Sequence, residues 1–205
     1  MLYPRETKSG QLVTDEQMVC YREHLTQQHR VLFLSGIIGK SCGVCGQGEL
    51  EGQNLLLALD SLSHKPIKLI ITSPGGDVDS AFLFYDTIKL IKSPVITIGR
   101  YCASAAAMLL AAGQKRYVLP HAKVMLHLVS GSMVGDAREW EIQHKQLQGY
   151  MNRMVDILLE CGIKRTRDEV MRDIDRDFWL EPEEAIEYGL ADAILDKKTL
   201  GGWLS

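Results

Sequence analysis

Short runs of apolar residues, many of them β-branched, alternate along this chain with longer segments of helical periodicity. The strand-like runs fall at 31–34, 67–72, 95–98, 116–119, 124–127 and 193–195. The helical patterns fall at 15–29, 54–62, 78–91, 103–112, 136–161, 167–173 and 182–188, and a glycine-rich loop is expected at 39–52. Strands that alternate with helices predict an α/β fold with a largely parallel sheet.

The composition is that of an ordinary globular domain and argues against several classes of protein. The 205 residues, 46% of them apolar, are enough for one sizeable core. A net charge of −3 without a long basic block argues against nucleic acid as the main partner. No apolar run reaches the length of a membrane span, and residues 1–6 lack the apolar region of a signal peptide. With an odd number of cysteines, these features predict a reduced, cytoplasmic location.

The turn Ser73-Pro74-Gly75-Gly76 directly follows the clearest strand and precedes a helix. Proline fixes one φ angle, and glycines adopt backbone conformations closed to other residues. At the carboxyl end of a strand, such a turn aims free N–H groups into the crevice where α/β proteins bind ligands. The alternative is a tight turn without a chemical role.

Ser104 opens a helix of very small residues, and this position has two interpretations. A serine there commonly caps the helix with its side chain. It is also a suitable place for a nucleophile, because the helix dipole and the Ala105 N–H would stabilise a developing oxyanion. Cys102 is a rival nucleophile, although a packed thiol is the simpler interpretation.

His127 ends an apolar strand, and Asp177 closes the acidic stretch Asp173-Ile174-Asp175-Arg176-Asp177. Together with Ser104 they would supply the base, the orienting acid and the nucleophile of a covalent acyl hydrolase. A hydrogen-bonded core histidine and a solvated acidic stretch are the alternatives. A calcium loop is excluded, because Phe178 stands where such a loop requires glycine.

The segment Cys42-Gly43-Val44-Cys45 has the spacing of half a zinc site. The other cysteines stand alone in the sequence, so no second pair completes a set of four ligands. The sequence therefore predicts no metal and no other cofactor.

Several segments together resemble the Clp protease proteolytic subunits, which are self-compartmentalising serine peptidases of the ClpP/crotonase-like superfamily. The resemblance runs from Val31 to Leu195 and is best at 73–76, 85–88, 103–105, 109–113, 124–127 and 184–190. It implies an α/β fold of repeated β-β-α units with a protruding long handle helix at 136–161. It also implies an N-terminal arm and first helix at 1–30, a peptidase domain at 31–195 and a C-terminal tail at 196–205.

By this resemblance Ser104 is the nucleophile, His127 the general base and Asp177 the orienting acid. The backbone N–H groups of Gly76 and Ala105 would form the oxyanion hole. The resemblance also implies unfolded polypeptides as substrates, a hexameric AAA+ unfoldase as partner, and two stacked heptameric rings (a tetradecamer), either of one subunit or mixed with a paralogue. ATP would bind the partner, because this chain has no Walker A motif.

Two stretches depart from the family's usual residues. They are Arg100-Tyr101-Cys102 before the nucleophile and Leu128-Val129 after the base. These departures leave open a structural or regulatory subunit that is silent without a partner. A third hypothesis is an acyl-CoA hydratase or isomerase of the same superfamily, which would give no joint role to Ser104, His127 and Asp177.

Overall fold

A computed structural model describes residues 15–39 and 49–196 of the chain. Most of the predicted glycine-rich loop, with Cys42 and Cys45, lies outside these residues, as do the first 14 residues and the tail beyond Asp196. The strands are β1 (Val31–Ser35), β2 (Ile67–Ser73), β3 (Val95–Ala103), β4 (Lys115–Leu126), β5 (Phe178–Leu180) and β6 (Ala193–Ile194). The helices are α1 (Asp15–His29), α2 (Glu49–Leu62), α3 (Val78–Leu90), α4 (Ala105–Ala111), α5 (Ala137–Glu160), α6 (Arg167–Asp173) and α7 (Pro182–Tyr188).

One sheet of strand order β1-β2-β3-β4-β5 forms the centre of the molecule, with β6 also paired to β4. The first four strands are parallel, and β5 runs antiparallel to β4. The carboxyl ends of β1 to β4 therefore meet at one edge of the sheet, where open α/β sheets bind ligands. The predicted α/β class with a largely parallel sheet is confirmed.

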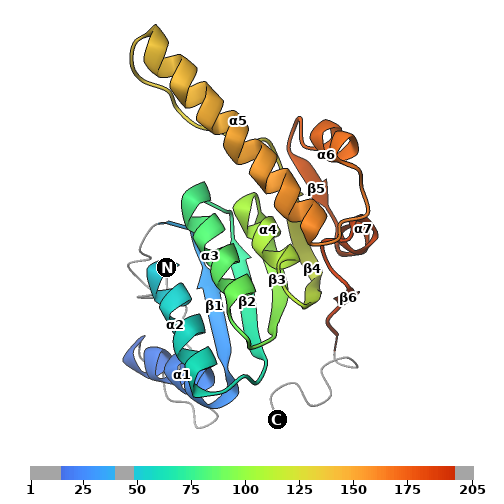
Figure 1. Cartoon of the computed structure of the whole chain (residues 1–205). Helices are drawn as coiled ribbons and strands as arrows, with labels where there is room; N and C mark the ends of the chain where they lie inside the picture. Colours follow the sequence, from blue (N-terminus) through green and yellow to red (C-terminus); the bar gives the residue numbers. More distant parts are fainter. Residues whose placement is uncertain (1–14, 40–48, 197–205) are drawn as a thin grey trace.

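Helices α2, α3 and α4 lie side by side over one face of the sheet (Figure 1). All seven residues of α4 are buried, and this helix contacts β2, β3 and β4. Its run of alanines lets the helix backbone approach the sheet closely, so the core forms between α4 and the strands.

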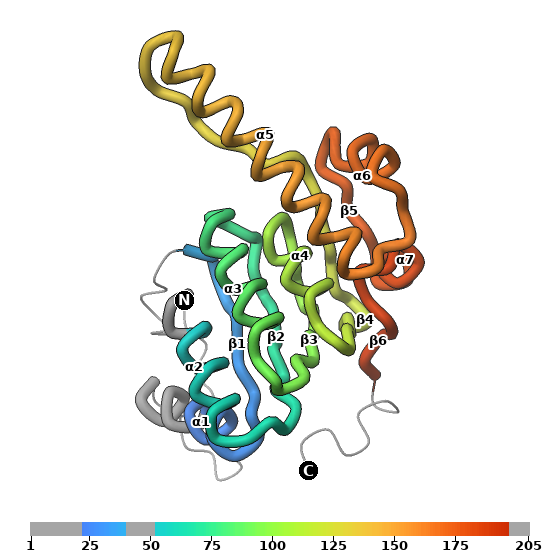
Figure 2. Tube along the Cα trace, in the orientation of Figure 1, coloured from blue at the N-terminus to red at the C-terminus, as the bar shows by residue number. Residues whose placement is uncertain are grey.

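The long helix α5 protrudes from the body of the molecule, with the segment before it running alongside (Figures 1 and 2). Asp136 caps its first turn by accepting hydrogen bonds from the N–H groups of Arg138 and Glu139. Only its second half, from Met151 onward, buries side chains against the body. The expected protruding helix is thus present, and none of the described helices combines the length and apolarity needed to cross a membrane.

The structure corrects the sequence-based prediction at four elements. Helix α2 begins at residue 49 rather than 54, and β3 continues to Ala103 instead of ending at 98. The two strands predicted at 116–119 and 124–127 form the single strand β4, and the three-residue strand β5 was not predicted. The register between β3 and β4 passes from Gly99 opposite Val118 to Tyr101 opposite Lys123, so β4 crosses Pro120 as a bulge.

Candidate active site

The turn after β2 is held against the segment that follows β1. Ile38 donates its N–H to Gly75 O at 2.9 Å, and Asp77 donates its N–H to Ile38 O at 3.0 Å. The hydroxyl of the buried Ser73 accepts the Gly75 N–H at 3.1 Å. These bonds fix the path of the chain between β2 and α3.

Glycine is required at both positions of this turn. Gly75 has φ +92° and Gly76 has φ +153°, in a region that side chains disfavour. A Cβ atom on Gly75 would lie 2.7 Å from Ser104 Cβ, and one on Gly76 would lie 2.2 Å from Ile38 O. The turn therefore packs directly against the first turn of α4. A turn that only connects a strand to a helix would not need such close packing.

Two backbone donors remain available at this junction. Within the described residues, neither the Gly76 N–H nor the Ala105 N–H donates a hydrogen bond to the protein. Ala105 is the first residue of α4, where helix N–H groups have no partner inside the helix. The two residues predicted for the oxyanion hole thus line one cavity and both offer free N–H groups.

Ser104 occupies the sharp turn between β3 and α4 with φ +57° and ψ −127°. Among the described non-glycine residues, Arg30 alone shares a positive φ. The Ser104 side chain makes no capping hydrogen bond, so the capping interpretation is wrong. Its N–H donates to Met125 O at 2.8 Å, which ties the turn to the end of β4. Strained backbone of this kind is concentrated at functional sites, and a strand-to-helix turn exposes a nucleophile well.

Cys102 is unsuited to be the nucleophile. Its side chain is fully buried, and burial raises the pKa of the thiol to about 12. The thiol therefore stays protonated at neutral pH, and the thiolate is the reactive form. The interpretation as a packed thiol is confirmed.

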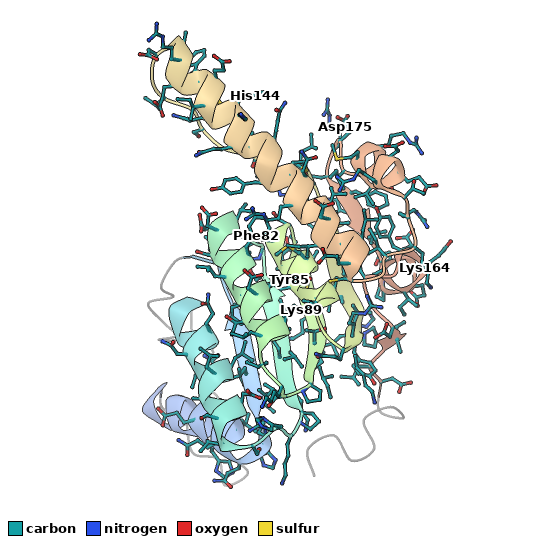
Figure 3. The ribbon with its side chains drawn as sticks, viewed as in Figure 1. Phe82, Tyr85, Lys89, His144, Lys164 and Asp175 are labelled. Carbon is teal, nitrogen blue, oxygen red and sulfur yellow. The ribbon has the colours of Figure 1, made fainter. Side chains whose placement is uncertain are left out.

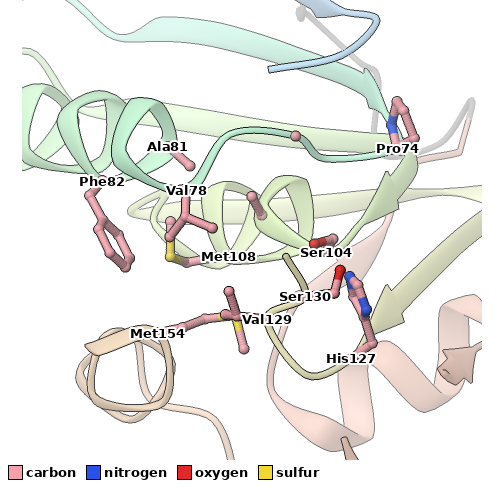
Figure 4. A pocket seen from close by; sticks show the side chains of 12 residues that line it. Pro74, Val78, Ala81, Phe82, Ser104, Met108, His127, Val129, Ser130 and Met154 are labelled. Carbon is pink, nitrogen blue, oxygen red and sulfur yellow. The ribbon is translucent and has the colours of Figure 1, made fainter. Parts of the chain in front are cut away.

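His127 follows the last residue of β4 and is half-buried. Its ring lines the same cavity as Ser104, and the two side chains point toward the same space in Figure 4. Ser130 lies beside the imidazole in this view and also lines the cavity. His127 is thus part of an open pocket, unlike an enclosed core histidine.

Asp177 is exposed and directly precedes β5. Leu126 and Phe178 are partners in the antiparallel register of β4 and β5. His127 directly follows Leu126 and Asp177 directly precedes Phe178, so the two residues flank the last pair of this register. The unpredicted strand β5, through its pairing with β4, is therefore the element that positions Asp177 relative to His127.

Ser104 and His127 line the cavity, whereas Asp177 does not. Among the described residues, the Ser104 hydroxyl, the His127 imidazole and the Asp177 carboxylate make no side-chain hydrogen bond. Catalytic hydrogen bonds are often long in unliganded sites and tighten when substrate binds. Within the described residues of the single subunit, the three predicted side chains are therefore not joined by hydrogen bonds.

The cavity measures about 220 Å³ and extends away from Ser104 and His127 (Figure 4). Its far part is lined by uncharged, mostly apolar side chains from three helices and one loop, namely Val78, Ala81, Phe82, Met108, Val129 and Met154. The sequence placed several of these residues on apolar helix faces, but helical periodicity does not distinguish a core residue from one that lines a pocket. The described residues contain no cluster of three or more potential metal ligands.

A family model described as "Clp protease" matches residues 27–198 of the chain. Subunit 4 of the chloroplastic ATP-dependent Clp protease proteolytic component of Arabidopsis thaliana is 39% identical over 145 residues. That alignment covers 69% of this chain and 49% of the relative, so the chain spans about half the length of that protein. The ATP-dependent Clp protease proteolytic subunit 1 of Rhodopirellula baltica is 34% identical over 180 residues, which cover 82% of this chain and 78% of the relative.

Proposed function

Because this chain belongs to the Clp protease family, we propose that it is a serine endopeptidase that degrades unfolded polypeptides to short peptides. The observation that carries the proposal is one cavity lined by Ser104, His127, Gly76 and Ala105. A nucleophile, a base and two free N–H donors at one place are the equipment for hydrolysing an acyl bond. The family match favours this class over the acyl-CoA hydratase or isomerase alternative.

The chemistry would proceed through an acyl-enzyme. His127 takes the Ser104 proton while the hydroxyl oxygen attacks the peptide carbonyl, and the imidazolium then protonates the leaving amine. Asp177 orients the imidazole and stabilises its charge. Water, deprotonated by His127, then attacks the ester and releases the peptide.

The developing oxyanion would be bound by the N–H groups of Gly76 and Ala105. The first-turn position of Ala105 adds the positive end of the α4 dipole, though this helix is short. Loss of one such donor typically raises the barrier by about 3 kcal/mol, which is on the order of a hundredfold in rate.

The apolar part of the cavity would bind the side chain on the acyl side of the cleaved bond. Its lining carries no charged group, so burying a charged substrate side chain there would be costly. Two flexible methionines, Met108 and Met154, belong to the wall and allow for different apolar shapes. We expect cleavage after apolar residues.

We propose that the chain assembles into stacked heptameric rings, alone or with a paralogous subunit. The exposed leucines Leu57, Leu62, Leu83 and Leu90 lie on α2 and α3, on the helical side of the sheet. The exposed pair Tyr101 and Trp179, with ring centroids 6.2 Å apart, lies on strands β3 and β5. Two different apolar surfaces on one subunit suit the head-to-tail contacts of a closed ring. The protruding half of α5 would join two rings.

A hexameric AAA+ unfoldase would supply unfolded chains and consume the ATP. Both curated relatives are described as ATP-dependent, whereas this sequence has no Walker A motif and we propose no cofactor for it. We also propose a cytoplasmic location, although the Arabidopsis relative is described as chloroplastic.

The lack of hydrogen bonds among the three proposed catalytic residues favours a second candidate. This candidate is a subunit that is active only in a mixed assembly. No hydrogen bond links Ser104, His127 and Asp177 in the single described chain. Contacts from a neighbouring subunit would then be needed to close the triad.

The direct test is hydrolysis of fluorogenic peptides and of an unfolded protein by the assembled wild type and by Ser104→Ala. The proposal expects cleavage that disappears in the variant. Ser130→Ala serves as a control, because it removes a second cavity hydroxyl without removing the nucleophile. Activity that appears only after a paralogous subunit is added would support the second candidate. Equal hydrolysis by Ser104→Ala would contradict both.

A further inference from the structure

Two tyrosine–carboxylate hydrogen bonds join α5 to α3. Tyr150 on α5 donates its hydroxyl to Asp79 Oδ2 at 2.8 Å. Tyr85 on α3 donates its hydroxyl to Glu160 Oε2 at 3.2 Å. Hydrogen bonds to ionised acceptors are stronger than those between neutral groups, so both are suited to fix the spacing of the two helices.

The first of these bonds lies one helical turn from a cavity-lining residue on both helices. Phe82 follows Asp79 by three residues and Met154 follows Tyr150 by four, so each lies one helical turn from the bonded pair. Both side chains are buried, and both line the cavity. Figure 4 shows them at the end of the cavity away from Ser104 and His127.

Further contacts connect Tyr150 to this wall. The Tyr150 ring lies 6.2 Å from the Phe82 ring, and the Arg153 guanidinium lies 5.5 Å from the same ring. The hydrogen bond to Asp79 also raises the pKa of Tyr150, so the hydroxyl stays a donor at neutral pH. Asp79 lies in the first turn of α3, where a negative charge is favourable.

The second bond offers a matched comparison. Tyr85 follows Phe82 by three residues on α3, beside the same helix α5 (Figure 3). Neither Tyr85 nor Glu160 lines the cavity. Removing the Tyr85 hydroxyl therefore removes a bond of the same chemistry between the same two helices, but one that is anchored on α5 at Glu160, beyond the turn that follows Met154.

We propose that Tyr150, through its hydrogen bond to Asp79, is a positioning residue that sets the width of the cavity and hence its selectivity for substrate side chains. The bond keeps Phe82 and Met154 at their present separation. Without it the two walls would move apart, and larger side chains would fit. The consequence for cleavage rests on the proposed peptidase function, whereas the consequence for the cavity does not.

The kinetic test compares peptides with alanine, leucine or phenylalanine on the acyl side of the cleaved bond. For Tyr150→Phe we expect kcat/KM for the phenylalanine peptide, divided by kcat/KM for the leucine peptide, to rise several-fold. The change should come from a lower KM for the phenylalanine peptide. The rate for the alanine peptide should stay unchanged, because its side chain does not reach the wall. Tyr85→Phe should leave the ratio at the wild-type value.

A double-mutant cycle separates this specific bond from general loosening. Asp79→Ala should change the ratio as much as Tyr150→Phe, and the double variant should change it no further. Asp79→Asn should keep the wild-type ratio, because the amide oxygen still accepts the hydroxyl. Additive effects, or an equal effect of Tyr85→Phe, would overturn the proposal.

A measurement that needs no catalysis distinguishes the positioning role of Tyr150 from the proposed peptidase function. In the assembled protein with 13C-methyl-labelled methionine, the Met154 resonance should shift in Tyr150→Phe and Asp79→Ala but not in Tyr85→Phe. N-acetyl-phenylalaninamide should perturb it at lower concentration in the first two variants than in wild type. An unchanged Met154 resonance in Tyr150→Phe would contradict the positioning role. Absence of hydrolysis in wild type would instead count against the peptidase function.

Discussion

At the scale of single residues, the site depends on backbone positions that few side chains tolerate. Gly76 turns the chain so closely past Ile38 that no Cβ atom fits between them. Ser104 keeps a positive φ although it carries a side chain, and its N–H is anchored to Met125 O. These two constraints place a hydroxyl and two free N–H groups around one cavity.

Gly76→Ala should therefore lose both local structure and activity. A Cβ atom would lie 2.2 Å from Ile38 O, so the turn must shift and withdraw its N–H donor. We expect labelling of Ser104 by a serine-directed probe to slow by about a hundredfold or more, as for loss of an oxyanion-hole donor.

Gly36→Ala is the control for this change. Gly36 also has a positive φ, +86°, but a Cβ atom there would meet nothing within 4 Å. We expect it to lose about 1 to 2 kcal/mol of unfolding free energy from backbone strain and to keep the labelling rate. Equal labelling rates for Gly36→Ala and Gly76→Ala would contradict the role given to Gly76.

The sequence indicated these residues but not their conformations. Pro74 and the two glycines predicted a turn with free N–H groups, because the conformational freedom of glycine is local information. The cap expected of Ser104 was a reasonable prediction from its place before a helix, yet its side chain makes no cap and its N–H is bonded to Met125 O at the end of β4. Tertiary contacts of this kind cannot be read from local sequence.

At the scale of elements, the prediction failed where neighbours in space override local pattern. Gly52 suggested a loop, but it lies inside α2, where a Cβ atom would be 3.0 Å from Phe84 Cε2. Two strands were predicted at 116–119 and 124–127, but β4 continues across Pro120 between them as a bulge. Strand β5 has three residues after an acidic stretch, too few for a periodic pattern. Its pairing with β4 nevertheless leaves Asp177 and His127 as the two residues that flank the Leu126–Phe178 pair.

Helix α6, which precedes Asp177, begins with a capping box whose removal should be measurable. The Thr166 hydroxyl and the Glu169 carboxylate are 2.8 Å apart, and the Thr166 side chain accepts the Glu169 N–H. Thr166→Ala should lower the unfolding free energy by about 1 kcal/mol at pH 7, and Thr166→Ser should restore it.

The pH dependence of this effect follows from Glu169. The Thr166 N–H and hydroxyl lower the pKa of its carboxyl. The stabilisation is therefore present above the unfolded pKa, about 4.3, and is lost as the pH falls through the folded value. The difference between wild type and Thr166→Ala, measured by urea unfolding, should shrink from pH 7 to pH 3. A difference independent of pH would show that the carboxylate takes no part.

At the scale of the whole molecule, the single subunit leaves large apolar side chains exposed. Trp140 and Ile142 are each 55% exposed on the protruding half of α5, far from the core (Figure 1). Exposed aromatic and branched side chains on one projection are typical of an interaction site. The amphipathic pattern of this helix was predicted from sequence, but the pattern alone did not show which half would protrude.

Trp140→Ser and Ile142→Ser should weaken assembly without unfolding the subunit. We expect smaller particles in sedimentation velocity and an unchanged midpoint of subunit unfolding, because neither side chain belongs to the core. Glu141→Ser, between them on the same helix, should assemble as wild type does. If both apolar variants also formed particles of wild-type size, the protruding half of α5 would not join the rings.

The proposed peptidase function depends most on Ser104 being an activated nucleophile. The measurement that tests this directly is the intact mass of the assembled protein after treatment with a serine-directed fluorophosphonate, for wild type and Ser104→Ala. We predict one adduct per wild-type subunit and none in the variant. No adduct on assembled wild type, or an adduct that persists in Ser104→Ala, would contradict the proposed serine peptidase.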